Sequence, residues 1–301
     1  MTNALNQNKG GGEIHPSPSL SLRAAAKLNL HLSILGRRTD GYHLLNMVMI
    51  KLSLADQINL IRRDGHGINL TIQGADLPTG RDNLIVKAAE DFYNATEIER
   101  GVEMTLQKHI PVAAGLGGGS SDAAATLKGL NELYGSPLTQ NELFNLGLAL
   151  GADVPFFLFS GSTAFVEGIG ERISPAPALP TTHFLLVNPG WPLSTAWVYN
   201  NYKLELTIKP KKLIPSSLNE SSFTINRVLH NDLESVVLPQ YPEVEKIKSL
   251  LVAEGASGAL MSGSGPTVFG VFSRKRDSEQ ARERMIVLGQ GQWIVILAHN
   301  I

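Results

Sequence analysis

The amino-acid sequence predicts an α+β protein with two domains. Apolar residues alternate with polar ones along Leu28–Ile34, the period of two that strands show, and a glycine-rich loop at Gly115–Gly119 follows an expected strand and precedes an expected helix. Ser174–Thr182 then contains three prolines, which is typical of a junction between domains, and a new series of helices and strands follows it. We therefore expect a flexible tail in residues 1–19, a first domain in 20–173 and a second in 174–301.

The first domain combines strands with helices. A strand is expected over Leu20–Leu35, and Arg37–Gly41 predicts a turn because its Asp-Gly step favours positive φ. Thr139–Glu142 is a capping box, which starts a helix that ends before Gly151. The other expected elements are strands at Met47–Leu54, Gln57–Arg62, Ile68–Gln73, Val102–His109 and Ser162–Val166, and helices at Asn83–Ala95 and Asp122–Tyr134.

The second domain has a different order of elements. Pro242 near its start and Gly255 after its end delimit a helix over Pro242–Glu254. The other expected elements are strands at Phe184–Val187, Thr267–Phe272 and Trp293–Ala298, helices at Thr195–Tyr202 and Asp277–Leu288, and a polar loop at Lys209–Ser222.

Composition excludes several classes of function. The 301 residues contain no cysteine, which excludes disulfides, thiol nucleophiles and cysteine-bound metals. The formal net charge is −1, so no excess of positive charge favours nucleic acid or an anionic membrane. Residues 1–19 lack the apolar core of a signal peptide and the arginines of a transit peptide. We expect a cytoplasmic protein without an obligate protein partner, and no protein-held metal.

The glycine-rich loop is the strongest functional signal. Four glycines in the five positions Gly115–Gly119 let the backbone approach an anion closely, and the helix that follows presents free N–H groups to it. The loop has no lysine, which excludes a Walker A motif, and Ser120 stands where a dinucleotide fingerprint needs Gly or Ala. A plain turn with a serine cap is the alternative. The expected phosphate-binding residues are Pro111, Val112, Ala113, Ala114, Gly115, Leu116, Gly117, Gly118, Gly119, Ser120 and Ser121.

Three segments together resemble the GHMP kinases, which phosphorylate galactose, homoserine, mevalonate and phosphomevalonate. They are Ala26–Leu30, the loop Pro111–Ser121 with the Asp-Ala-Ala after it, and Met261–Thr267. The resemblance implies an N-terminal domain like the second domain of ribosomal protein S5 and a ferredoxin-like C-terminal domain. It also implies that ATP is the phosphate donor, with Mg²⁺ carried by the nucleotide.

Further segments narrow the resemblance within this family. Arg38–His43, Asp82–Leu84 and Gly151–Phe156 are similar to members that phosphorylate the 2-hydroxyl of a cytidine diphosphate ester of methylerythritol, on the route to isoprenoids. The resemblance places Asp153 as the base at the acceptor hydroxyl and Lys27 beside it. The expected substrate contacts are Asn29, Tyr42, His43, Thr195 and Tyr199, with Tyr42 and His43 at the cytosine; Asn83 and Lys108 are expected at the nucleotide.

Each of these residues also has a structural alternative. Asp153 suits a turn, Lys27 and Lys108 suit solvated positions, and Asn83 suits a helix N-cap. Tyr42 and His43 suit a turn that packs its rings, and Tyr199 suits a core contact with Trp197. Asp122 most simply complements the dipole of the helix that it begins, with a Mg²⁺ role as the alternative.

Two other functions stay open at this point. The chain could be another GHMP kinase, acting on homoserine or a mevalonate derivative. It could also be a nucleotide-binding regulator without catalysis, although such a protein has no need of both Lys27 and Asp153. The failed dinucleotide fingerprint disfavours a Rossmann oxidoreductase.

Overall fold

A computed structural model describes residues 18–99, 101–177, 179–203, 213 and 225–301. Nearly all of the expected tail, and the expected polar loop at Lys209–Ser222 apart from Leu213, lie outside the described residues. Within them, no helix is long and apolar enough to cross a membrane.

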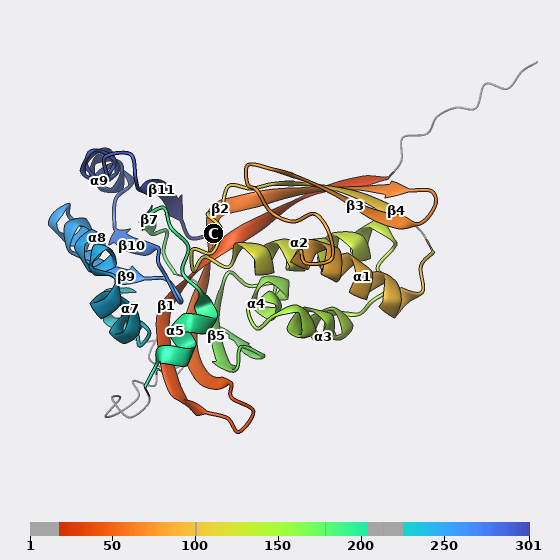
Figure 1. Cartoon of the computed structure of the whole chain (residues 1–301), viewed down its shortest axis with the longest axis horizontal. Coiled ribbons are helices and arrows are strands. Elements are labelled where there is room, and N and C mark those ends of the chain that lie inside the picture. The colour runs from red at the N-terminus through yellow and green to blue at the C-terminus, as the bar shows by residue number, and fades with distance from the viewer. Residues whose placement is uncertain (1–17, 100, 178, 204–212, 214–224) are drawn as a thin grey trace, which may run out of the picture.

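A seven-stranded sheet organises the N-terminal part of the molecule (Figure 1). Its main path runs β3-β4-β2-β1-β8, while β5 pairs with β2 and β6 with β5. Helices α1 to α4 lie together on one side of this sheet (Figure 1). The strands are β1 (Ser19–Arg37), β2 (His43–Arg63), β3 (Gly67–Gln73), β4 (Gly101–Gln107), β5 (Thr163–Gly168), β6 (Arg172–Pro175) and β8 (His230–Asn231). The helices are α1 (Leu84–Thr96), α2 (Gly118–Leu133), α3 (Gln140–Leu150) and α4 (Val154–Leu158).

A four-stranded antiparallel sheet, in the order β11-β7-β10-β9, forms the core of the C-terminal part. Helices α8 and α9 lie at the far side of this sheet from the N-terminal helices (Figure 1). The strands are β7 (His183–Asn188), β9 (Gly258–Met261), β10 (Val268–Phe272) and β11 (Ile294–His299). The helices are α5 (Thr195–Asn201), α6 (Ile225–Val228), α7 (Glu234–Gln240), α8 (Pro242–Ala253) and α9 (Lys275–Leu288).

Local sequence signals explain most of the helix boundaries. Asn83 caps α1, because its side-chain oxygen accepts the backbone N–H of Ile85 at 2.9 Å. Thr139 and Glu142 form the expected capping box at the start of α3. Small residues in α2 allow it to lie close to the sheet, since a Cβ on Gly129 would come within 2.5 Å of Leu60. The expected α+β class is therefore confirmed at the level of single elements.

Strand β2 corrects the expectation of two separate strands at Met47–Leu54 and Gln57–Arg62. It runs unbroken over 21 residues, although the buried Asp56 interrupts its apolar pattern. The Asp56 carboxylate accepts hydrogen bonds from the backbone N–H groups of His109 and Ile110 and from Lys108. Because these hydrogen bonds satisfy the buried carboxylate, Asp56 interrupts the hydrophobic pattern of the sequence without ending the strand.

Strand β1 corrects the expectation that Leu28, Leu30, Leu32 and Ile34 share one face of the strand. Register shifts between Ala25 and Lys27 and between Asn29 and His31 turn the strand over twice. Outside the shifts, Leu32 packs with the cluster under the helices, whereas Leu28, between them, packs with the other cluster. The two bulges thus bring Lys27 and Asn29 to the face that carries the helices.

Candidate active site

One cleft of about 700 Å³ gathers residues from both parts of the molecule. Its walls come from β1, β2, the loop before α1, the glycine-rich loop, the segment before α4, and α5. Of the expected site residues, Lys27, Asn29, Tyr42, His43, Asn83, Lys108, Pro111, Val112, Ala113, Ala114, Gly115, Leu116, Gly117, Gly118, Gly119, Ser120, Asp153, Thr195 and Tyr199 line it. Ser121 does not, because it is buried within α2.

The glycine-rich loop has a backbone that only glycine fits at its two tightest points. Gly115 and Gly117 have φ of +75° and +71°. A Cβ on Gly115 would lie 2.1 Å from the carbonyl oxygen of Ser262, and one on Gly117 would lie 3.0 Å from Cγ of Lys27. The loop is therefore wedged between the C-terminal part of the chain and the strand that carries Lys27.

Helix α2 starts inside the glycine-rich loop, which corrects the expected start at Asp122. Gly117 is its N-cap and makes no side-chain cap, so the serine cap of the alternative interpretation is not formed. Gly118, Gly119 and Ser120 form the first turn and line the cleft. Their position directs the free N–H groups and the positive end of the helix dipole into the cleft, an arrangement suited to phosphate.

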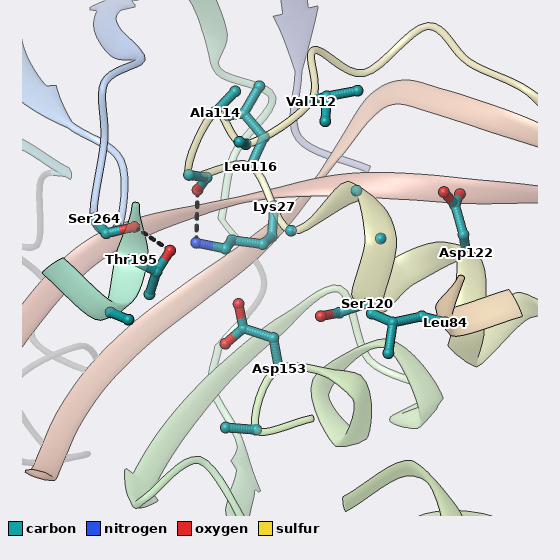
Figure 2. Close-up of a pocket in the computed structure, with 18 of the residues that line it drawn as sticks. Lys27, Leu84, Val112, Ala114, Leu116, Ser120, Asp122, Asp153, Thr195 and Ser264 are labelled. Atoms are coloured by element: carbon teal, nitrogen blue, oxygen red, sulfur yellow. Dashed lines mark hydrogen bonds between the residues drawn. The ribbon is translucent and has the colours of Figure 1, made fainter. Parts of the chain in front are cut away.

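Lys27 lies at the centre of the cleft and is almost fully buried (Figure 2). Its Nζ donates to the carbonyl oxygen of Gly115 at 2.8 Å and to Oδ1 of Asn29 at 2.5 Å. Burial lowers the pKa of Lys27, against the opposing effect of the Asp153 carboxylate. A solvated lysine is therefore excluded, and within the described part of the chain both hydrogen-bond acceptors of this cation are neutral.

Asp153 lies directly before α4, with its carboxylate directed towards Lys27 (Figure 2). It occupies the N-cap position, yet its side chain makes no capping hydrogen bond. Pro155 follows in the first turn, where a missing N–H costs nothing. The carboxylate consequently stays available to the cleft, which the turn-residue interpretation does not explain.

Lys108 is not a solvated lysine either. It is buried between Asp56 and Asp122, and its Nζ lies 2.8 Å from Oδ2 of Asp122. The other carboxylate oxygen of Asp122 is buried and has no hydrogen-bond partner among the residues that the structure describes. Burial raises the pKa of Asp122, and Asp56 adds to this effect while Lys108 opposes it.

Asp122 therefore departs from its expected role, because it is the fifth residue of α2 and not part of the first turn. Its carboxylate binds a lysine from the strand side instead of complementing the dipole. Sequence reasoning missed Asp56 altogether. The only signal was an acidic residue in the middle of an apolar strand pattern, and such residues are buried only when they are paired.

The expected substrate residues Asn29, Tyr42, His43, Thr195 and Tyr199 all line the cleft. Tyr42 is 59% exposed, whereas His43 is buried, and the His43 ring packs against that of Tyr199 with centroids 5.4 Å apart. Thr195 Oγ1 and Ser264 Oγ lie 2.8 Å apart, which ties the start of α5 to the C-terminal glycine loop (Figure 2). Trp197 contacts Tyr241 edge-on, and Tyr199 lines the cleft.

Asn83 caps α1, as its structural alternative predicted, and also lines the cleft, while its contact with the nucleotide stays a prediction. Burial, with a contribution from Arg37, lowers the pKa of His43, which favours a neutral ring.

Among the residues that the structure describes, no group of three or more His, Cys, Asp or Glu side chains is arranged to hold a metal ion.

Comparison with protein families gives two matches along the chain. The model for the GHMP kinases N terminal domain matches residues 83–161, and the model for the GHMP kinases C terminal matches residues 216–287. Together they cover the glycine-rich loop, Asp153 and the C-terminal glycine loop.

Individual relatives match nearly the whole chain. A 4-diphosphocytidyl-2-C-methyl-D-erythritol kinase from Geobacter sulfurreducens is 45% identical over 88% of this chain and 94% of its own. A crystal structure of a 4-(cytidine 5'-diphospho)-2C-methyl-D-erythritol kinase superposes with a TM-score of 0.78 at 35% identity, covering 93% of this chain and 99% of that one. The homoserine kinase from Cytophaga hutchinsonii has the same fold, with a TM-score of 0.70 at 19% identity over 99% and 98% of the two chains.

Proposed function

The chain belongs to the GHMP kinase family, and we propose that it transfers the γ-phosphate of ATP to the 2-hydroxyl of 4-diphosphocytidyl-2-C-methyl-D-erythritol, in the methylerythritol phosphate route to isoprenoids. The chain is an ATP-dependent kinase with the two-domain mixed α and β fold of this family. One observation carries the mechanism: Lys27, Asp153 and the N-terminus of α2 converge in a single cleft.

The glycine-rich loop and the first turn of α2 are suited to hold the triphosphate. Their backbone N–H groups supply hydrogen-bond donors, and Gly115 and Gly117 leave the space that a Cβ would fill. Mg²⁺, when it arrives with the nucleotide, neutralises part of the phosphate charge. Asn83 lines the cleft and is suited to contact the nucleotide; Lys108 lines it too, but its ammonium group is paired with Asp56 and Asp122, so a contact with the nucleotide stays a prediction for it.

Lys27 and Asp153 are suited to the transfer itself. Asp153 is placed to accept the proton of the attacking hydroxyl, because its carboxylate makes no cap and faces the cleft. Lys27 is placed to stabilise negative charge on the attacking oxygen or on the transferred phosphoryl group. Its contacts with Gly115 and Asn29 hold the ammonium group at this point.

The acceptor is proposed to lie between the Tyr42–His43 segment and the start of α5. Exposed Tyr42 is free to cover a nucleobase, while the buried His43 ring is held by Tyr199. Tyr199 therefore supports His43 in the cleft wall, and a direct stack of Tyr199 on the base stays a prediction. Asn29 and Thr195 are suited to contact the hydroxyl and diphosphate groups of the acceptor. The cytoplasmic location also stays a prediction.

A panel of acceptors tests this proposal. The purified protein is incubated with Mg²⁺-ATP and, in separate reactions, the cytidylyl substrate, its uridylyl analogue, methylerythritol phosphate, homoserine and mevalonate. We expect ADP and a phosphorylated product with the cytidylyl compound and very poor turnover of the others. Turnover of homoserine or mevalonate alone would contradict the substrate assignment, and binding of ATP without any turnover would favour a regulator.

A further inference from the structure

Helix α4 is the element that positions Asp153, and it is very short. It has five residues, Val154 to Leu158, all apolar and all buried. A single helical turn is not stable by itself, because its few hydrogen bonds do not offset the cost of ordering the chain. The position of Asp153 therefore depends on the packing of these buried side chains and on the groups that bind the other end of this turn.

Three side chains from three different elements bind the carbonyl groups at that end. Lys128 of α2 donates through Nζ to the carbonyl oxygen of Phe157 at 2.8 Å. Gln140 of α3 donates through Nε2 to that of Leu158 at 3.2 Å. Lys51 of β2 donates through Nζ to that of Phe159, the C-cap residue, at 2.6 Å. Three consecutive carbonyl groups that a short helix leaves free are thus all satisfied by side chains.

Burying the two lysine ammonium groups, Lys51 and Lys128, costs free energy. Neither ammonium group has a carboxylate partner within the described part of the chain, and both are partly buried. Burial, together with the neighbouring Lys128 charge, lowers the pKa of Lys51 to about 8, and burial lowers that of Lys128. The Phe156 ring, 5.4 Å below the Lys51 ammonium, offsets some of this cost.

We propose that Lys51, Lys128 and Gln140 form a clamp on the C-terminal end of α4 that positions Asp153 for proton transfer. This inference rests on the proposed function, in which Asp153 is the base. The clamp residues do not reach the reacting atoms and act only through α4. Two cations at the negative end of the helix dipole also favour the helix itself. Because Lys128 belongs to the helix that begins at the phosphate loop, the clamp ties the base to the phosphate cradle.

Matched substitutions separate this role from simple stabilisation. Lys51→Met and Lys128→Met, singly and together, remove the donor and keep most of the side-chain volume, whereas Lys128→Arg and Lys128→Gln keep a donor. Asn131→Ala is the control, because Asn131 also donates from α2 to a carbonyl group, that of Leu138 at 3.0 Å, without touching α4. For each variant, kcat, KM for ATP and melting temperature are measured with the cytidylyl acceptor, well below the melting range.

We expect the double Met variant to lose about 10-fold to 100-fold in kcat, the cost of a base displaced by up to about 1 Å. KM for ATP should change less than kcat. Values of kcat should decline in the order parent, Lys128→Arg, Lys128→Gln, Lys128→Met. Asn131→Ala should lower the melting temperature and keep kcat. If the double variant does not fold, the three Lys128 variants provide the same ranking.

The clamp is overturned if every folded variant keeps kcat within twofold of the parent, whatever its melting temperature. Asp153→Asn is measured in parallel to separate this failure from that of the proposed function. A working parent, an impaired Asp153→Asn and unimpaired clamp variants would reject the clamp alone. A parent that does not turn over the cytidylyl acceptor would reject the substrate assignment instead.

Discussion

Lys27 and Lys108 line the same cleft and are both buried, but they differ in what surrounds them. Lys108 lies between the carboxylates of Asp56 and Asp122, and these charges raise its pKa in spite of burial. Lys27 binds a carbonyl oxygen and an amide oxygen, and burial lowers its pKa. Asp153 acts on Lys27 electrostatically without forming an ion pair with it among the described residues.

From this difference we infer that Lys108 stabilises the fold, whereas Lys27 takes part in the proposed phosphoryl transfer. The charge of Lys108 is already neutralised by protein groups, so it fixes β4, α2 and Asp56 of β2 in place below the phosphate loop. No ion pair neutralises the charge of Lys27 within the described part of the chain. An anionic oxygen that enters the cleft would therefore provide the negative partner that this ammonium group lacks. Two lysines with similar burial are therefore expected to respond differently to substitution.

The largest effect is expected where the cleft loses the proposed base beside Lys27. Asp153→Asn should lower kcat by about 10²–10⁴-fold, because the amide cannot accept a proton, while binding of ATP is kept. Steady-state kinetics with a calorimetric titration of an ATP analogue check this. An unchanged kcat would show that Asp153 is only a turn residue, and the contrast between the two lysines would lose its chemical meaning.

Exchanging each lysine for methionine tests the contrast directly. Lys27→Met should lower kcat by about 10²–10³-fold, the usual cost of losing one group that stabilises the transition state. It should not reduce the free energy of unfolding, because it removes a buried charge that no carboxylate neutralises. Lys108→Met should instead reduce that free energy by about 3–5 kcal/mol, since it leaves two buried carboxylates unpaired.

Urea unfolding and kcat are measured for both methionine variants. The comparison fails if the two variants show the same pattern, whether both lose stability or both lose only activity.

Tyr42→Ala should sharpen the distinction between the two ends of the cleft. Loss of one stacked base costs about 1–3 kcal/mol, so KM for the cytidylyl substrate should rise about 10-fold or more. KM for ATP should stay the same, because in the proposed arrangement Tyr42 contacts the acceptor while the glycine-rich loop holds the triphosphate. An equal rise in both KM values would mean that this segment closes the cleft and does not recognise the base.

The smallest effect is expected in the pH dependence of stability at the Lys108 end. The pKa of Asp122 is raised in the folded state, so the folded protein retains a proton that the unfolded chain releases. Stability should therefore fall as pH rises from about 3.9, the ordinary pKa of an aspartate, through the raised value. Asp122→Asn should flatten this slope. Urea unfolding at several pH values provides the test, and an unchanged slope would assign it to another group.

Much of the fold could be predicted from local signals in the sequence. The capping box at Thr139 and the N-cap at Asn83 set helix starts as expected, since both depend only on residues within four positions. Elements without such signals were missed: α4 is too short to show helical periodicity, and β8 has two residues. The bulges of β1 leave no mark on composition, so the faces of that strand could not be assigned.

In the candidate site, too, features set by neighbouring residues could be predicted from the sequence, whereas contacts between distant residues could not. The glycine-rich loop was recognisable because glycine is required where the backbone turns to positive φ. The contacts of Lys108 were not, since Asp56 is 52 positions away and meets it only through strand pairing. Likewise, Lys51 and Lys128 resemble ordinary surface lysines in the sequence, and only the packing of three elements around α4 brings them together.

The short strand β8 affects how this protein can be divided for experiments. It pairs in parallel with β1 at His31 and Leu32, although it follows the proline-rich junction by some fifty residues. A fragment that ended at residue 173 would expose the edge of β1 at His31 and Leu32, and exposed strand edges recruit other chains. We expect such a fragment to self-associate when expressed alone. A workable truncation would have to extend at least to Asn231, so for expression the two halves of this chain are a single unit.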